Sequence, residues 1–357
     1  MKRRWKVLLG TGGVLLALAL VPIVTIETTC RSPIEGFDTQ GYNSRLKDAA
    51  WQRDEARTWL TFPEWYIVYS AESFGEFLKT RPPSAYHYAR DIRGFWSSYC
   101  AMNQAAAGRA GADARIMLYT IGLSYSAELM VKAAYENTLG RLSELIGGYR
   151  STDDAYATKV QQRYGAFMHE TPWYEFPFGR AFSGLWDTRE PHATFRHWER
   201  RLALSAEYGV KAGYAKAIGA ASGASLGRDE RTLRMVVRST PQALQKVDGR
   251  FKIVTPADKG LLTVEAPRYA QFTDLLAKLS TSPVQLVEIS GNDDIFVTLL
   301  LPPKAPVPGP GAHLLTTALD APAGWRRVGV STKVADLLDV IRQARSAGGR
   351  VEHVYDY

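Results

Sequence analysis

TLRMVVRS, residues 232–239, marks the point where the chain changes from helical to alternating hydrophobicity. RFKIVTP, residues 250–256, follows the polar turn at 247–249, and this spacing predicts a hairpin. Four more strands and two helices are expected before the C-terminal strand RVEHVYDY, with a Pro/Gly linker at 302–312. The predicted fold of residues 227–357 is therefore an α+β sandwich with ferredoxin-like βαβ units.

The sequence before this point is typical of helices. Apolar residues recur at helical spacing through residues 55–226, which predicts a mainly helical domain. The polar, turn-rich residues 30–54 are interpreted as a tether. The expected helices cover residues 62–79, 85–107, 113–147, 151–169 and 190–224.

Small residues recur near the end of the last expected helix, at Gly209, Gly213, Gly219 and Gly223. Such repeats allow two helices to approach closely. Because charged residues such as Lys211 lie among them, we expect this helix to pack tightly on a neighbour in a water-soluble bundle. A second membrane pass is the competing interpretation.

Residues 7–26, VLLGTGGVLLALALVPIVTI, contain no charge. A helix of about twenty residues crosses the ~30 Å apolar layer of a membrane. Lys and Arg lie only on its N-terminal side, which places the N-terminus in the cytoplasm. Residues 1–29 are thus predicted to be a single-pass anchor in the plasma (inner) membrane, with the rest of the chain periplasmic or otherwise extracytoplasmic. A cleaved signal peptide is the alternative.

The chain has two cysteines, Cys30 and Cys100. In an oxidising compartment they are expected to form one disulfide, which would tie the segment after the membrane span to the helical domain. The alternative for Cys100 is a buried thiol, because it falls on the apolar stripe of its helix.

The net charge of +8 includes four cations that precede the predicted span, so the remainder carries only a weak positive field. Nucleic acid is therefore excluded as an expected partner. The histidines lack the spacing of helical metal ligands, and neither a nucleophile elbow nor a phosphate-binding loop is present. No metal or cofactor is predicted. Arg196, Arg200 and Arg201 near His197 are interpreted as a basic surface.

A capping box is predicted in TWLTFPEWYIVYS, residues 58–70. Thr61 and Glu64 have its T-x-x-E spacing, in which each side chain bonds the other residue's amide. Pro63 falls in the first turn, where a missing donor is tolerated. The acid beside the proline is therefore explained as a helix start rather than as a catalytic carboxylate.

WYEFPFGR, residues 173–180, has the same acid, proline and aromatics but lacks the cap. We weigh three interpretations: a wedge in the helical core, contact with the membrane surface, and a ligand pocket. A carboxylate in an apolar wall has a raised pKa, as acid catalysis requires. The residues that such a pocket would use are Trp173, Tyr174, Glu175, Phe178, Arg180, Glu64 and Glu128.

A predicted anchor and two predicted domains without a recognisable catalytic motif favour a membrane-anchored, non-catalytic interaction or accessory subunit. Its expected partner is another membrane or periplasmic protein. An enzyme or small-molecule binder with carboxylates in an aromatic-lined pocket of the helical domain is the alternative. A transporter component with further passes at 116–135 or 206–226 is the third.

Overall fold

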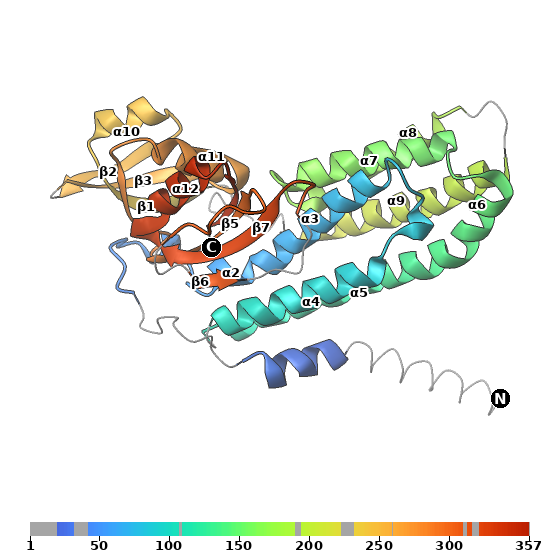
Figure 1. The fold of residues 1–357 in the computed structure, drawn as a ribbon, viewed down its shortest axis with the longest axis horizontal. Coiled ribbons are helices and arrows are strands. Elements are labelled where there is room, and N and C mark those ends of the chain that lie inside the picture. The colour runs from blue at the N-terminus through green and yellow to red at the C-terminus, as the bar shows by residue number, and fades with distance from the viewer. Residues whose placement is uncertain are drawn as a thin grey trace.

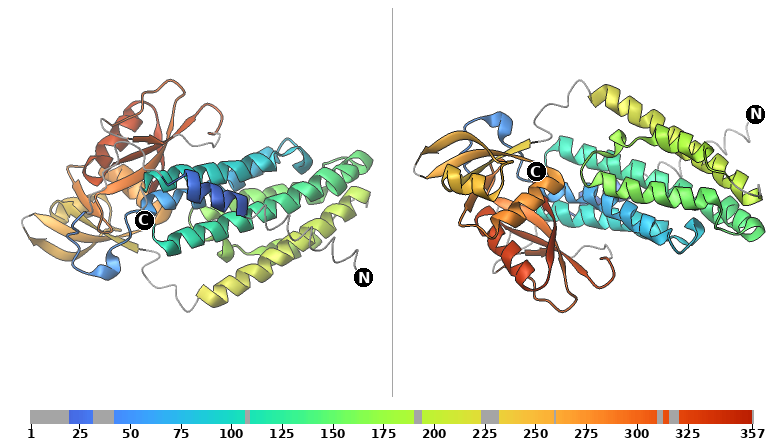
Figure 2. Two further views of the ribbon diagram at one scale, coloured as in Figure 1. Left: turned by 90° about the horizontal axis from the view of Figure 1, so that it is seen from below. Right: turned by 90° about the horizontal axis from the view of Figure 1, so that it is seen from above.

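A computed structural model shows a mixed fold, with an elongated helical N-terminal region beside a C-terminal region of antiparallel sheets (Figure 1). The two regions join end to end, so the helices extend away from the sheets (Figure 2). The structure describes residues 20–31, 42–106, 109–189, 194–222, 232–258, 260–309, 313–315 and 321–356.

The helical region follows the predicted periodicity closely. Its helices are α2 (Arg57–Leu60), α3 (Phe62–Phe77), α4 (Tyr88–Ala105), α5 (Ala112–Tyr135), α6 (Arg141–Gly147), α7 (Thr152–Met168), α8 (Phe178–Trp186) and α9 (Phe195–Ser222). Short 3-10 turns are η1 (Ala49–Trp51), η2 (Pro83–Ala85) and η4 (Trp173–Glu175), and the π-helical turn η3 (Glu136–Gly140) separates α5 from α6. The expected helix at 113–147 is therefore continuous but carries one π-turn.

The capping box predicted at the start of α3 is wrong. Thr61 has helical dihedral angles and makes no capping bond, because α2 runs into α3 almost without a break. Its hydroxyl donates instead to the Arg57 carbonyl, at 2.7 Å. The true capping box lies at α7, where Ser151 and Asp154 bond each other's amides.

The described glycines of α9 make no close contact with a neighbouring helix. A Cβ placed on Gly209, Gly213 or Gly219 would meet no atom within 4 Å. The expectation that they press the helix on a neighbour is therefore wrong for these three residues, and Gly223 lies outside the described residues.

Two four-stranded sheets form the C-terminal region. The first has the order β2-β3-β1-β4, from β1 (Thr232–Arg238), β2 (Lys252–Asp258), β3 (Leu261–Pro267) and β4 (Gln285–Ile289). The second has the order β6-β7-β5-β8, from β5 (Asp294–Leu301), β6 (His313–Leu315), β7 (Arg326–Lys333) and β8 (Arg350–Tyr355). Neighbouring strands are antiparallel throughout.

The hairpin predicted between residues 232–239 and 250–256 is wrong. Helix α10 (Pro241–Val247) follows β1, with Thr240 as its N-cap, so β2 cannot turn back onto β1. Strand β1 pairs instead with β3 and β4. The helix was not predicted from the sequence, because seven residues are too few to show a clear helical periodicity.

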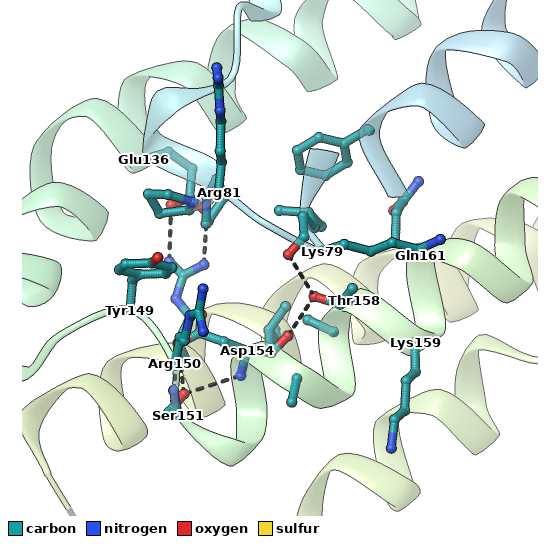
Figure 3. Close-up of a pocket in the computed structure, with 18 of the residues that line it drawn as sticks. Lys79, Arg81, Glu136, Tyr149, Arg150, Ser151, Asp154, Thr158, Lys159 and Gln161 are labelled. Atoms are coloured by element: carbon teal, nitrogen blue, oxygen red, sulfur yellow. Dashed lines mark hydrogen bonds and ion pairs between the residues drawn. The ribbon is translucent and has the colours of Figure 1, made fainter. Parts of the chain in front are cut away.

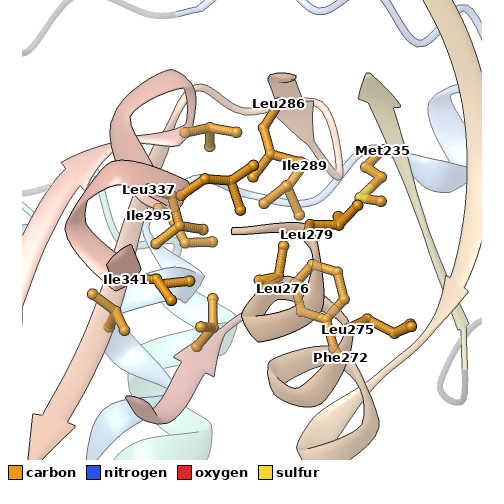
Figure 4. Close-up of a cluster of buried hydrophobic side chains, with 14 of the residues drawn as sticks. Met235, Phe272, Leu275, Leu276, Leu279, Leu286, Ile289, Ile295, Leu337 and Ile341 are labelled. Carbon is orange, nitrogen blue, oxygen red and sulfur yellow. The ribbon is translucent and has the colours of Figure 1, made fainter. Parts of the chain in front are cut away.

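Helices α11 (Tyr269–Leu279) and α12 (Leu337–Ser346) supply the apolar side chains that join the two sheets into one core. Phe272, Leu276, Leu279, Leu337 and Ile341 are all completely buried in it (Figure 4). Burial of each such side chain stabilises the fold by roughly 1.5–3 kcal/mol. The C-terminal region thus has an ordinary interior, apolar and closely packed.

The predicted disulfide is confirmed: Cys30 is bonded to Cys100. It fixes a helix at residues 20–29 against α4 and α5, where Glu27 accepts a 2.6 Å hydrogen bond from Tyr119. This helix lies beside the bundle, and its residue-20 end points away from the C-terminal region (Figures 1 and 2). Ile26 is buried, whereas Val21 is exposed.

In the part of the chain that the structure describes, no helix is long and apolar enough to cross a membrane. Residues 7–19 of the predicted span lie outside that part.

Helix α2 and the start of α3 join the two regions. Thr58 donates to the Tyr355 carbonyl at 2.6 Å and accepts from the Phe296 amide at 2.9 Å. The Trp59 indole donates to Ser331 at 3.1 Å. Aromatic residues in this segment therefore dock onto β5, β7 and β8, and their role is to hold the regions together.

Candidate functional site: a charged interior and a cavity in the helical region

Helix α9 has its charged side chains on the inside. Arg196, Arg200, Glu207 and Lys211 recur at spacings of four, seven and four residues, which places them on one helix face. Arg196 is completely buried and Arg200 is 3% exposed. A helix in water normally has the opposite arrangement.

Ion pairs connect this face to α5, η3 and α7. Arg196 donates to both carboxylate oxygens of Asp154, at 3.1 and 2.7 Å. Arg200 pairs with Glu136 at 2.8 Å, and also with Glu199. The arginines predicted to form a basic surface are therefore buried and paired, because four carboxylates from neighbouring turns and helices surround them: Glu136, Asp153, Asp154 and Glu199.

Two lysines and two glutamates continue the network towards the middle of the bundle. Lys211 Nζ lies 2.8 Å from Glu128 and 3.3 Å from Glu207, and Lys132 Nζ lies 3.0 Å from Glu207. Burial opposes the ionisation of Glu207, but the two lysines lower its pKa to about 2. The same pairing raises the pKa of Lys211 well above its ordinary value, although burial opposes it.

An open cavity of about 430 Å³ lies beside this network (Figure 3). The end of α3, the start of α7, and the facing sides of α5 and α9 form its walls. Phe74, Leu78, Leu204 and Tyr208 supply apolar surface. Six cations and three carboxylates also line it: Lys79, Arg81, Lys132, Arg150, Lys159, Arg200, Glu136, Asp154 and Glu207.

The cations that line the cavity fall into two groups. Lys132 and Arg200 are paired with carboxylates inside it, and Lys79 pairs with Glu76 on its own helix. Arg81, Arg150 and Lys159 are exposed and have no carboxylate partner among the described residues. The rim is therefore positively charged, and the cavity can attract an anion.

A smaller cavity of about 60 Å³ lies deeper in the bundle. At its wall Asp91, 2% exposed, accepts hydrogen bonds of 2.6 Å from both Ser70 and Tyr86. Tyr125 in turn donates to Ser70, also at 2.6 Å. These linked hydrogen bonds satisfy the buried carboxylate of Asp91 and stabilise the bundle.

The structure separates the residues predicted to form one pocket. Glu64 lies at the joint between the two regions, where burial raises its pKa and Arg57 and Arg268 oppose the rise. Glu128 lines the smaller cavity and pairs with Lys211. Neither the larger nor the smaller cavity is lined by Glu64, Glu175 or Arg180.

The WYEFPFGR segment divides between interior and surface. Phe176 and Phe178 are buried against Tyr164 in a cluster between α7, α8 and α9. Trp173 and Tyr174 are half-buried. Glu175 and Arg180 are exposed, and within the described ranges no ion pair links them.

Three carboxylates meet where the tether enters the helical region. Glu55, Asp293 and Asp294 bring oxygen atoms within 4.8 Å of one another. Arg109 pairs with Glu55 at 2.6 Å, and Lys333 lies 3.0–3.1 Å from the two aspartates. Both cations already pair with these carboxylates, so the cluster is an ion-paired joint.

The outer surface of the bundle is unusually apolar. Val131 is 71% exposed, Leu145 80% and Val210 72%. We call the following exposed residues of α5, η3, α6 and α9 the apolar face: Ile116, Met117, Met130, Val131, Leu139, Leu142, Leu145, Ile146, Phe195, Trp198, Leu202, Val210 and Tyr214. In the described residues after 231, Val254 is the single large hydrophobic side chain of comparable exposure.

Sequence reasoning missed both the cavity and the inverted helix. The cavity walls come from four helices that are far apart in the sequence, so no local motif marks them. The inverted pattern of α9 was visible, because Trp198, Leu202 and Val210 alternate with the charged face at helical spacing. The comparisons with known proteins give no relative, since no family model, curated protein or solved structure matches this chain.

Proposed function

We propose that this protein is a membrane-anchored, non-catalytic subunit of a membrane assembly, whose apolar face lies against the apolar part of the bilayer. The observation that carries the proposal is the reversed arrangement of the bundle, with ion pairs inside and large apolar side chains outside. Exposed apolar patches of this size mark membrane or protein contact sites. Polar groups that face a bundle interior are typical of helices in contact with lipid.

The position of helix 20–29 favours the bilayer as the occupant of the apolar face. This helix contains the end of the predicted span, and the disulfide and Glu27 hold it alongside α4 and α5. Its exposed side chains include Leu20, Val21 and Val24. If residues 7–26 insert into the membrane, α5 must come close to the same lipids.

The C-terminal region supports the accessory role. The described part of its surface has no comparable apolar patch, so lipid contact is proposed for the bundle and the C-terminal region is proposed to lie in water. Its first half has the order β1-α10-β2-β3-α11-β4 with the sheet order β2-β3-β1-β4, which supports a ferredoxin-like assignment. The disulfide is consistent with an extracytoplasmic location.

Flotation with liposomes tests the contact with lipid. A chain that lacks residues 1–19 is mixed with phosphatidylethanolamine/phosphatidylglycerol vesicles, and its disulfide and circular dichroism verify folding. We expect it to float with the vesicles. The combined substitution Val131→Glu, Leu145→Glu and Val210→Glu should abolish flotation, because a carboxylate in the apolar layer costs several kcal/mol.

The matched control is Val254→Glu, which changes an exposed apolar side chain of the C-terminal region. It should leave flotation unchanged. A truncated chain that stays monomeric in buffer and unbound would contradict the membrane contact. Native electrophoresis of the full chain from mild detergent tests the assembly, and migration as a solitary protein would exclude the accessory role.

A further inference from the structure

We propose that the 430 Å³ cavity binds the head group of an anionic phospholipid, with the acyl chains lying over the adjoining apolar face. This inference rests on the proposed membrane function. Its starting point is size, because the volume falls within the 300–1,000 Å³ range typical of ligand sites. The cavity is also open to solvent, so a ligand can enter it without rearrangement of the bundle.

The charge of the lining selects an anion. Arg81, Arg150 and Lys159 stand at different walls of the cavity, and each lacks a carboxylate partner in the described part of the chain. An excess of positive over negative charge in the lining of a cleft raises the local concentration of anions. Guanidinium groups form paired hydrogen bonds with oxyanions such as phosphate and carboxylate, which favours a ligand of this class over a halide.

The ion pairs deeper inside define how far the anion enters. Glu136 and Glu207 line the inner wall, where Arg200 and Lys132 already neutralise them. An added anion in this inner part would have to displace a carboxylate from its partner. The anion is therefore attracted to the outer part of the cavity, where the lining carries the three exposed cations.

The apolar parts of the lining indicate an amphiphile. Phe74, Leu204 and Tyr208 form apolar wall inside the cavity. Tyr149 lines the rim and follows Leu145 and Ile146, which are prominent members of the apolar face. The cavity lining at Tyr149 is thus only a few residues along the chain from the apolar face, where acyl chains can lie, as a phospholipid requires and a small phosphate ester does not.

Native mass spectrometry of the full chain in detergent tests the proposal. The chain is titrated with phosphatidylglycerol, and separately with phosphatidylcholine of the same acyl chains. We expect one phosphatidylglycerol to be retained about tenfold more tightly than phosphatidylcholine. The combined substitution Arg81→Gln, Arg150→Gln and Lys159→Gln should remove this preference, while all three exposed positions allow the fold to form.

The control changes the same amount of charge elsewhere, by Arg93→Gln, Lys216→Gln and Lys246→Gln, which are exposed and do not line the cavity. It should keep the preference. Equal loss in both triple variants would overturn the site, because the effect would then reflect net charge alone. Equal retention of the two lipids by the unmodified chain would overturn it as well.

Glycerol 3-phosphate distinguishes a lipid from a soluble phosphate. If the unmodified chain binds this head group alone as tightly as phosphatidylglycerol, the lipid assignment is overturned and the site takes a soluble ligand. This result can be told apart from failure of the membrane function, because liposome flotation depends on Val131, Leu145 and Val210, none of which lines the cavity.

Discussion

Trp65 of α3 stacks on His353 of β8, with ring centroids 3.5 Å apart and an interplanar angle of 28°. The contact joins the helical region to the C-terminal region, and both side chains are buried. Burial lowers the pKa of His353 well below its ordinary value, so the stacked imidazole is neutral near pH 7.

Replacement of Trp65 by alanine should therefore weaken the joint. Loss of a buried Trp typically costs about 3–5 kcal/mol, since the transferred surface and the remaining cavity both contribute. We expect a decrease of that size in the free energy of unfolding, measured by urea denaturation. Trp198→Ala is the control, because Trp198 is 49% exposed, and it should cost less than about 1 kcal/mol. Equal effects of the two substitutions would contradict the role of the stack.

The network around Glu207 should make the protein sensitive to acid. The pKa of Glu207 is about 2 in the folded protein and about 4.5 ordinarily, because Lys132 and Lys211 lie beside it. Its contribution to stability is complete above pH 4.5 and is lost as the pH falls towards 2. The amount is up to about 3 kcal/mol. In Glu207→Gln, the free energy of unfolding should fall less steeply between pH 4.5 and 3 than in the unmodified chain.

Glu175→Gln is the matched control for this change, because Glu175 is exposed and has no ion pair in the described part of the chain. Its pH profile should run parallel to that of the unmodified chain. If Glu207→Gln also gives a parallel profile, the lysines do not hold Glu207 ionised.

Glu55 should have the opposite effect on pH dependence. Burial raises its pKa to about 7; Arg109 opposes the rise and Asp294 adds to it. For a carboxyl whose pKa is raised on folding, stability is greatest below pH 4.5 and is lost as the pH rises towards 7. In Glu55→Gln this loss should be absent, which denaturation at pH 5, 6, 7 and 8 would measure. An unchanged decline would show that another group is responsible.

The sequence predicted elements whose signal is local. The helix expected at 151–169 is α7, which Ser151 and Asp154 cap, and the only two cysteines of the chain form the expected disulfide. Burial of charge was not predictable in the same way. Arg196 and Asp154 are 42 residues apart in sequence, and charged side chains are ordinarily exposed. The bundle reverses that rule because helices α5, α7 and α9 each bring opposite charges to one interior.

The acids proposed for one pocket lie in different places for a related physical reason. Glu64 and Glu175 occur in similar aromatic segments, and similarity of composition suggested a common site. The packing of each segment depends on a different partner: β5 and β8 for the first, α7 for the second. The cavity arose instead where α3 ends and α7 begins, from residues with no shared motif.

Two similar T/S-x-x-E/D sequences, at 61–64 and 151–154, allow a direct test of which one caps a helix. Ser151 accepts from the Asp154 amide at 3.1 Å, whereas Thr61 lies inside a continuous helix and its hydroxyl donates to the Arg57 carbonyl. Ser151→Ala should therefore lower the free energy of unfolding by about 1 kcal/mol. Thr61→Ala should lower it by less than about half of that, because helix interiors favour alanine and only one side-chain bond is lost. Urea denaturation of the two variants measures the difference. A larger loss for Thr61→Ala would mean that α3 begins at a true cap and that α2 is not continuous with it.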